Sequence, residues 1–96
     1  MEGTLSSLDV PEDVKRIFVT ARDVSPGGHV RMQAAFQRHC DSGISKTINF
    51  PSSAMVEDVR AIFFKAFQDG LKGVTVYRDG SRPNQPMALL HCESCD

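Results

Sequence analysis

Helical spacing of apolar residues marks the first half of the chain. The stretch from Pro11 to about Ala21 repeats apolar residues every three or four positions, and it begins with a proline, which favours the first turn of a helix. Ser25 and Pro26 combine a capping serine with a first-turn proline, so a second helix is expected to begin there and to end near Gly43. The apolar face of this second helix is expected to hold Met32, Ala35, Phe36, His39 and Cys40.

The pattern then changes to strand, helix and strand. Ile44 to Phe50 alternates apolar and polar residues, which predicts a strand that Pro51 ends. Lys72 to Arg78 predicts a second strand, and the clearest helix of the sequence lies between the two and ends at Gly70. The apolar stripe of this helix is expected to hold Val56, Val59, Ile62, Phe63, Ala66 and Phe67.

These elements predict an α/β fold in the order helix, helix, strand, helix, strand, with one right-handed parallel βαβ unit. Residues 1–10 are expected to be a flexible lead-in, residues 11–82 a small α/β domain, and residues 83–96 a C-terminal tail. Parallel strands normally lie within larger sheets that are covered on both faces. Because two strands alone leave unpaired edges, we expect this unit to be part of a larger sheet or barrel, or half of a dimer.

Composition and charge narrow the classes of partner. The 96 residues carry a formal net charge of −1, which removes a global electrostatic argument for binding a nucleic acid polymer. No apolar run is long enough to cross a bilayer, and the first residues lack the basic start and apolar centre of a signal peptide. Three cysteines in such a chain fit a reducing compartment better than a disulfide framework, so the cytoplasm is the expected location.

Cys92 and Cys95 form the one recognisable chemical constellation of the sequence. Two thiols at this spacing can form a disulfide or supply half of a tetrahedral zinc site, to which His91 adds at most a third ligand. No second cysteine or histidine pair is present to complete such a site, so no metal is assigned. Redox exchange, a partial zinc site and an unreactive pair remain open.

The carboxyl ends of the two strands form the edge at which open α/β folds usually bind ligands. Ser52 and Ser53 precede the N-terminus of the central helix, and Arg78 and Arg82 follow on the second strand and beyond it. Helix-terminal amides and guanidinium groups both bind anions. These four residues are therefore a candidate anion-binding edge.

Other polar and sulfur-containing residues are interpreted structurally. Cys40 is expected to be buried, and His29 and His39 to be packing or surface residues, because no acidic or thiol partner stands at ligand spacing. Three polar residues on the first strand are not assigned as ligands: Lys46, Thr47 and Asn49.

Five short motifs follow one another between His29 and Arg82: HVRMQAAFQ, SKTIN, a proline, VEDV and KGVTVYRDGSR. Their order and spacing resemble the C-terminal part of the barrel in adenosylcobalamin-dependent (class II) ribonucleotide reductases. The resemblance implies a ten-stranded α/β barrel in which Ile44 to Phe50 and Gly73 to Arg78 are neighbouring strands. Polar residues on such strands can face a polar barrel interior without violating the rules of burial.

The resemblance also implies functional expectations. The family's catalytic loop lies upstream of anything in this sequence, so the chain is not expected to catalyse ribonucleotide reduction alone. Adenosylcobalamin is implied for the full-length family, and none is expected to be bound by this chain. Cys92 and Cys95 resemble the C-terminal cysteine pair that passes reducing equivalents to the active site, and Tyr77 is expected to be structural.

The sequence therefore supports two alternative hypotheses for the function of the chain. In the first, the chain acts only as a segment of a reductase barrel, and the remainder of that barrel is its partner. In the alternative, it is a stand-alone interaction module derived from the barrel, which forms a homodimer through an exposed sheet edge. A third reading is an anion- or nucleotide-binding regulator that uses the strand edge.

Overall fold

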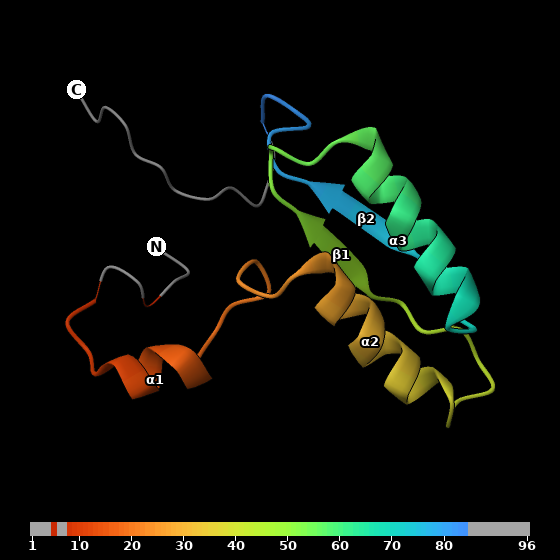
Figure 1. Cartoon of the computed structure of the whole chain (residues 1–96), viewed down its shortest axis with the longest axis horizontal. Coiled ribbons are helices and arrows are strands. Elements are labelled where there is room, and N and C mark those ends of the chain that lie inside the picture. Colours follow the sequence, from red (N-terminus) through yellow and green to blue (C-terminus); the bar gives the residue numbers. More distant parts are fainter. Residues whose placement is uncertain (1–4, 6–7, 85–96) are drawn as a thin grey trace.

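The order of helices and strands agrees with the order predicted from the sequence (Figure 1). The structure is a computed structural model of the chain, and it describes residue 5 and residues 8–84. Its elements are α1 (Glu12–Ile17), α2 (Pro26–Gln37), β1 (Thr47–Phe50), α3 (Val56–Gln68) and β2 (Thr75–Arg78).

β1 and β2 pair in parallel, which confirms the predicted βαβ unit. The register runs from Thr47 opposite Thr75 to Phe50 opposite Arg78. Beyond the last pair, the amide of Asp79 donates to the carbonyl of Phe50 at 2.9 Å, which continues the hydrogen bonding toward the turn. Both strands are shorter at their N-terminal ends than predicted.

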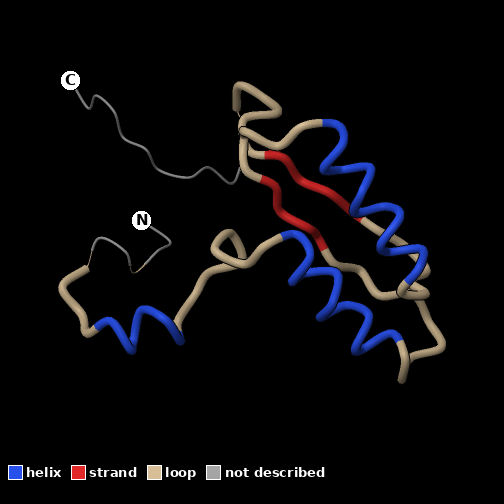
Figure 2. Tube along the Cα trace, in the orientation of Figure 1, coloured by secondary structure: helices blue, strands red, loops and turns tan. Residues whose placement is uncertain are grey.

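Both α2 and α3 pack on one face of the two-stranded sheet (Figures 1 and 2). The core contains Val30 from α2, Ile62 from α3, Ile48 and Phe50 from β1, and Ala54 from the loop between β1 and α3. The alternation predicted for the first strand is confirmed, since Ile48 is 0% exposed and Phe50 is 4% exposed. The core is therefore one layer deep, between two helices and one side of the sheet.

α2 buries a different face from the one predicted. Met32 and Phe36 are 57% and 65% exposed, and the rest of the predicted apolar face is also exposed. The buried residues of α2 are His29, Val30, Gln33, Ala34 and Gln37. The prediction was wrong because this helix buries glutamine amides, which an apolar pattern does not register.

Gln33 explains why an amide is buried here. Its Nε2 donates to the carbonyl of Ile44 at 3.2 Å and to the carbonyl of Gly73 at 2.9 Å. These carbonyls belong to the segments that lead into β1 and β2, so one side chain ties α2 to the start of both strands. The Oε1 atom of Gln33 is buried and has no hydrogen-bond partner among the described residues, so the amide stabilises the fold through its N–H groups.

Gln37 makes the corresponding contacts at the end of α2. Its Nε2 donates to the carbonyls of Cys40 and Ser42, each at 2.9 Å. The amide holds the backbone that leaves the helix, so α2 ends at Gln37 well before Gly43. Cys40 lies in this exit segment and is exposed, which corrects the prediction that it is buried.

The helix ends follow local rules with small differences. Ser25 caps α2 as predicted, since its hydroxyl accepts a hydrogen bond from the Gly28 amide at 3.1 Å. Gly70 has a φ of 75° and ends the helical segment that contains α3, where the sequence predicted the stop. α1 ends at Ile17 rather than near Ala21, and none of its residues is buried.

The stripe predicted for α3 divides into two faces. Ile62 and Ala66 are buried in the core and Val59 is half-buried, as expected. The other apolar members of the predicted stripe are exposed: Val56, Phe63 and Phe67. A two-stranded sheet with one neighbouring helix is too narrow to cover the full apolar circumference of α3.

We expect Gln33→Met to lower the free energy of unfolding by about 2 kcal/mol, because two carbonyls lose their donor where the strands begin. Urea denaturation followed by far-UV circular dichroism measures this difference. Gln68→Met, on the exposed side of α3, is the control and should change stability by less than about 0.5 kcal/mol. Equal stability of the two variants would contradict the role given to Gln33.

Candidate functional site

The face of the sheet opposite the helices carries polar side chains. Ile48 and Phe50 enter the core, so alternation directs Thr47 and Asn49 to the other face of β1. Thr47 is exposed and Asn49 is partly exposed. Of the three polar residues noted in the sequence, Thr47 and Asn49 therefore share one side of the strand, and Lys46 precedes it.

β2 extends this polar face. Parallel pairing places Thr75 beside Thr47 and Tyr77 beside Asn49, and partners in register project to the same side. Thr75 is exposed and Tyr77 is partly exposed. We call these four residues the open face: Thr47, Asn49, Thr75 and Tyr77.

The open face can form hydrogen bonds but has no formal charge. Hydroxyl and amide groups can both donate and accept, so such a face can bind neutral polar groups or water. It is suited to a polar interior and not to a second apolar layer. This arrangement explains why the first strand holds so many polar residues.

The carboxyl edge of the sheet is held by Arg78. Its Nε donates to the carbonyl of Ala54 at 3.1 Å, and its Nη2 donates to the carbonyl of Ser52. The guanidinium thereby fixes the loop that connects β1 to α3. Of the four residues predicted to form an anion-binding edge, the structure brings Arg78 against the loop of Ser52 and Ser53, while Arg82 is exposed.

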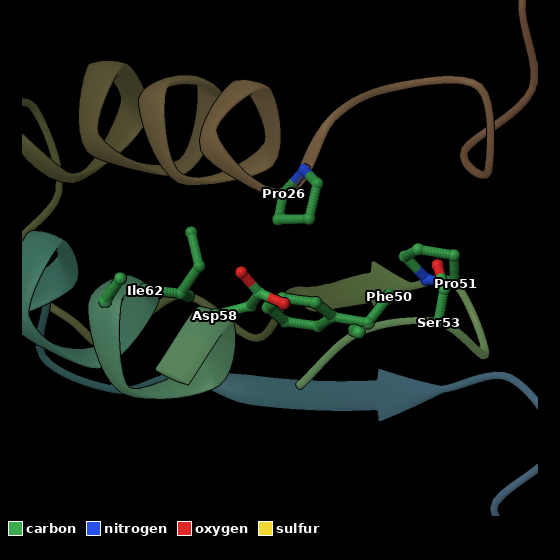
Figure 3. Close-up of a pocket in the computed structure, with 8 residues that line it drawn as sticks. Pro26, Phe50, Pro51, Ser53, Asp58 and Ile62 are labelled. Carbon is green, nitrogen blue, oxygen red and sulfur yellow. The ribbon is translucent and has the colours of Figure 1, made fainter. Parts of the chain in front are cut away.

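A pocket of about 360 Å³ lies between the N-termini of α2 and α3, above the end of β1 (Figure 3). Pro26 from α2, Phe50 from β1 and Asp58 from α3 are among its lining residues. Asp58 accepts a hydrogen bond from the amide of Met55 at 2.8 Å, so a carboxylate of the chain itself already caps α3. Anion binding at this edge stays a prediction, and an incoming anion would have Asp58 as a neighbour.

Arg22 is a residue at this edge that the sequence analysis missed. Its Nη1 lies 3.7 Å from Oδ1 of Asp79, directly after β2. The preceding residue, Ala21, accepts a hydrogen bond from Nε2 of His29 at 2.7 Å, which holds the same segment against α2. No local pattern could identify Arg22, because its partner Asp79 lies far along the chain, directly after β2.

The other candidate residues are placed as follows. His29 is buried and packs as described above, and His39 is exposed, so both fit the structural interpretation. Cys92 and Cys95 lie outside the described residues, as does His91. Within residue 5 and residues 8–84, no group of three or more histidine, cysteine, aspartate or glutamate side chains could hold a metal ion. None of the helices in that part of the chain is both long enough and apolar enough to span a membrane.

A family model described as "Ribonucleotide reductase, barrel domain" matches residues 4–77. The match covers most of the chain, including all five elements up to Tyr77 in β2. The chain therefore belongs to the ribonucleotide reductase barrel-domain family, and its βαβ unit resembles a segment of that barrel.

Individual relatives show which kind of ribonucleotide reductase the chain resembles. The chain is 51% identical over 92 residues to a vitamin B12-dependent ribonucleoside-diphosphate reductase of Thermoplasma acidophilum, an alignment that covers 96% of the chain and 12% of the relative. It is 48% identical over 79 residues to a protein of the same name in Mycobacterium tuberculosis strain H37Rv, covering 82% of the chain and 11% of the relative. A vitamin B12-dependent ribonucleotide reductase of Streptomyces coelicolor is 45% identical over 67 residues, covering 70% of the chain and 7% of the relative.

These relatives confirm the resemblance drawn from the five motifs. The chain spans about a tenth of the length of the curated relatives it matches. It is similar to one segment of a B12-dependent reductase, and the greater part of each relative has no counterpart in it.

We expect Arg78→Met to loosen the loop that precedes α3, because the carbonyls of Ser52 and Ala54 lose a charged donor. The free energy of unfolding should fall by about 1–2 kcal/mol. Amide hydrogen exchange across residues 51–56 should also become several-fold faster.

Arg82→Met is the matched control and should leave both measurements unchanged. Comparison of the wild-type chain with Arg78→Met also tests anion binding. If the edge binds anions, millimolar inorganic phosphate should raise the Tm of the wild-type chain and not that of Arg78→Met. Unchanged exchange in Arg78→Met would contradict the bracing role of this arginine.

Proposed function

We propose that this chain contributes part of the barrel wall of a vitamin B12-dependent ribonucleotide reductase. The observation that carries the proposal is the one-sided sheet. α2 and α3 cover one face of the paired strands, whereas the open face presents Thr47, Asn49, Thr75 and Tyr77. In an α/β barrel the helices lie outside and the opposite face lines the interior.

The proposed role is structural and positional, and it includes no catalysis by the chain alone. The open face holds hydroxyl and amide groups, and the described residues offer no nucleophile beside a base on that face. In the described part of the chain the sheet has two strands, so strands supplied by the remainder of the barrel can extend it. The remainder of the barrel would bring the catalytic loop and the substrate.

The described residues do not fit a cobalamin. The pocket at the carboxyl edge is about 360 Å³, near the lower limit for drug-sized ligands and far below what a corrin ring with its nucleotide tail needs. We therefore assign adenosylcobalamin to the complete reductase and no cofactor to this chain. A reducing cytoplasm is the location that fits the proposal, and the exposed thiol of Cys40 is compatible with it.

Complementation tests the proposal. The reductase of Thermoplasma acidophilum, truncated before the segment that matches this chain, should be inactive alone and should regain ribonucleotide reduction when the chain is added with adenosylcobalamin and a dithiol. Ile48→Asp, which places a carboxylate in the core, is the control and should not restore activity. Turnover by the isolated chain, or failure of the wild-type chain to bind the truncated enzyme, would contradict the proposal.

Cys92 and Cys95 are proposed as a reductant pair for such an enzyme. Oxidation would join the two sulfur atoms and release two electrons and two protons to the disulfide that is reduced. After incubation with an oxidised small-molecule disulfide, thiol titration should show two fewer thiols per wild-type chain. Cys92→Ser should lose this internal disulfide, and Cys40→Ser should keep it. Binding of one zinc ion per chain would favour a metal site over the redox role.

The alternative function is a self-associating interaction module. The small size of the described sheet and the large exposed apolar side chains favour it, because sheet edges and apolar surface are usually covered in a stable protein. As predicted from the sequence, this alternative is a dimer in which two copies of the chain pair through the exposed sheet edge.

A further inference from the structure

α3 has a second apolar face that no other element of the described residues covers. Val56, Phe63 and Phe67 are 78%, 50% and 83% exposed. At about 100° per residue these three side chains fall on one stripe, roughly a quarter of a turn from the core-facing Ile62 and Ala66. A helix that is apolar on two sides packs against two neighbours, and the described residues supply only one.

The stripe is shaped to receive a side chain. A shallow hollow of about 480 Å³ is lined by Val56, Val59, Arg60, Phe63 and Phe64. The first four of these residues stand at positions i, i+3, i+4 and i+7, which is the set that forms a hole for a knob from a facing helix. The surface of the hollow is almost purely apolar, and Arg60 places its guanidinium over the Phe64 ring, 5.6 Å from the ring centre.

The stripe also carries a protruding side chain, Phe67, at a distance along the helix that matches the position of the hollow. Phe67 lies one turn beyond Phe63 and is among the most exposed apolar residues of the described chain. The centre of the hollow and Phe67 lie on opposite sides of Phe63 and Phe64, at similar distances along the helix. A two-fold interface requires such self-complementarity, because the same patch must serve both partners.

We propose that α3 docks in antiparallel orientation onto α3 of a second copy of this chain. Phe67 of each copy enters the hollow of the other, and the rings of Phe63 and Phe64 meet at the two-fold axis. Each Arg60 then lies beside the other copy's Phe67 and away from the other Arg60, so no like charges are forced together. The proposal rests on the self-associating alternative and replaces the sheet edge with α3 as its surface.

The available area sets the strength of this dimer. Three partly exposed phenylalanines and a valine offer roughly 500 Å² per copy, when a phenylalanine side chain counts for about 150–250 Å². The total of about 1,000 Å² lies at the lower limit for specific interfaces. We therefore expect a reversible dimer with a Kd in the micromolar range, populated at high chain concentration.

Sedimentation equilibrium of the 96-residue chain from 10 μM to 1 mM tests the proposal. The mean mass should rise from that of one chain toward that of two. Phe67→Lys should weaken dimerisation by at least about 30-fold, since an ammonium group would enter an apolar hollow beside the guanidinium of the other copy's Arg60. Phe36→Lys is the matched control, because Phe36 is 65% exposed on α2 and lies off the stripe, and it should change Kd by less than about 2-fold. Far-UV circular dichroism checks that both variants keep the wild-type fold.

Cysteine cross-linking tests the orientation. In a chain whose three native cysteines are replaced by serine, Phe63→Cys should form an intermolecular disulfide quickly, because this position lies at the axis. Val56→Cys, at the end of the stripe, should cross-link at least about 10-fold more slowly.

Distinct outcomes overturn distinct claims. A chain that is monomeric at 1 mM refutes self-association of either kind. A dimer that survives Phe67→Lys refutes the α3 surface and leaves pairing through the strand edge. Neither result bears on the barrel-segment proposal, which the complementation experiment decides independently.

Discussion

The Gln33 amide connects the three parts on which the fold depends. It sits in α2, almost fully buried, and its two N–H groups reach the carbonyls of Ile44 and Gly73. A parallel pair has no tight turn to fix its register, so another contact must hold the entering segments at the right spacing. This side chain does so from the helix that covers them. The core of Val30 and Ile48 then assembles above a pair of strands whose spacing is already set.

The one-sided sheet follows from the same arrangement and links structure to family. With both helices on one face, the other face can be polar without loss of core, and four hydrogen-bonding side chains occupy it. A closed barrel is the architecture in which such a face is sheltered and both strand edges are paired. Membership of the reductase barrel family and the geometry of the βαβ unit therefore support the same reading of the chain.

Local signals predicted the elements well, and long-range contacts decided what the local signals missed. The capping Ser25, the stop at Gly70 and the alternation around Ile48 depend on neighbours along the chain, so they could be recognised in advance. The buried face of α2 could not, because Gln33 is buried only by virtue of carbonyls that the fold brings to it. At the candidate site, Arg78 was placed correctly at the strand edge, but its loop partners depend on the path of the backbone. No feature of the sequence indicated that Arg22 would pair with Asp79.

The parallel pairing of β1 with β2 has a consequence for biosynthesis. β1 leaves the ribosome before its hydrogen-bonding partner, since all of α3 is translated between them. Until α3 emerges, Ile48 and Phe50 have only α2 to cover them, and until β2 emerges β1 has no strand to pair with. α2 is translated before β1, and its Gln33 donates to the carbonyl of Ile44 at the start of that strand. α2 can therefore cover β1 until the rest of the βαβ unit is translated.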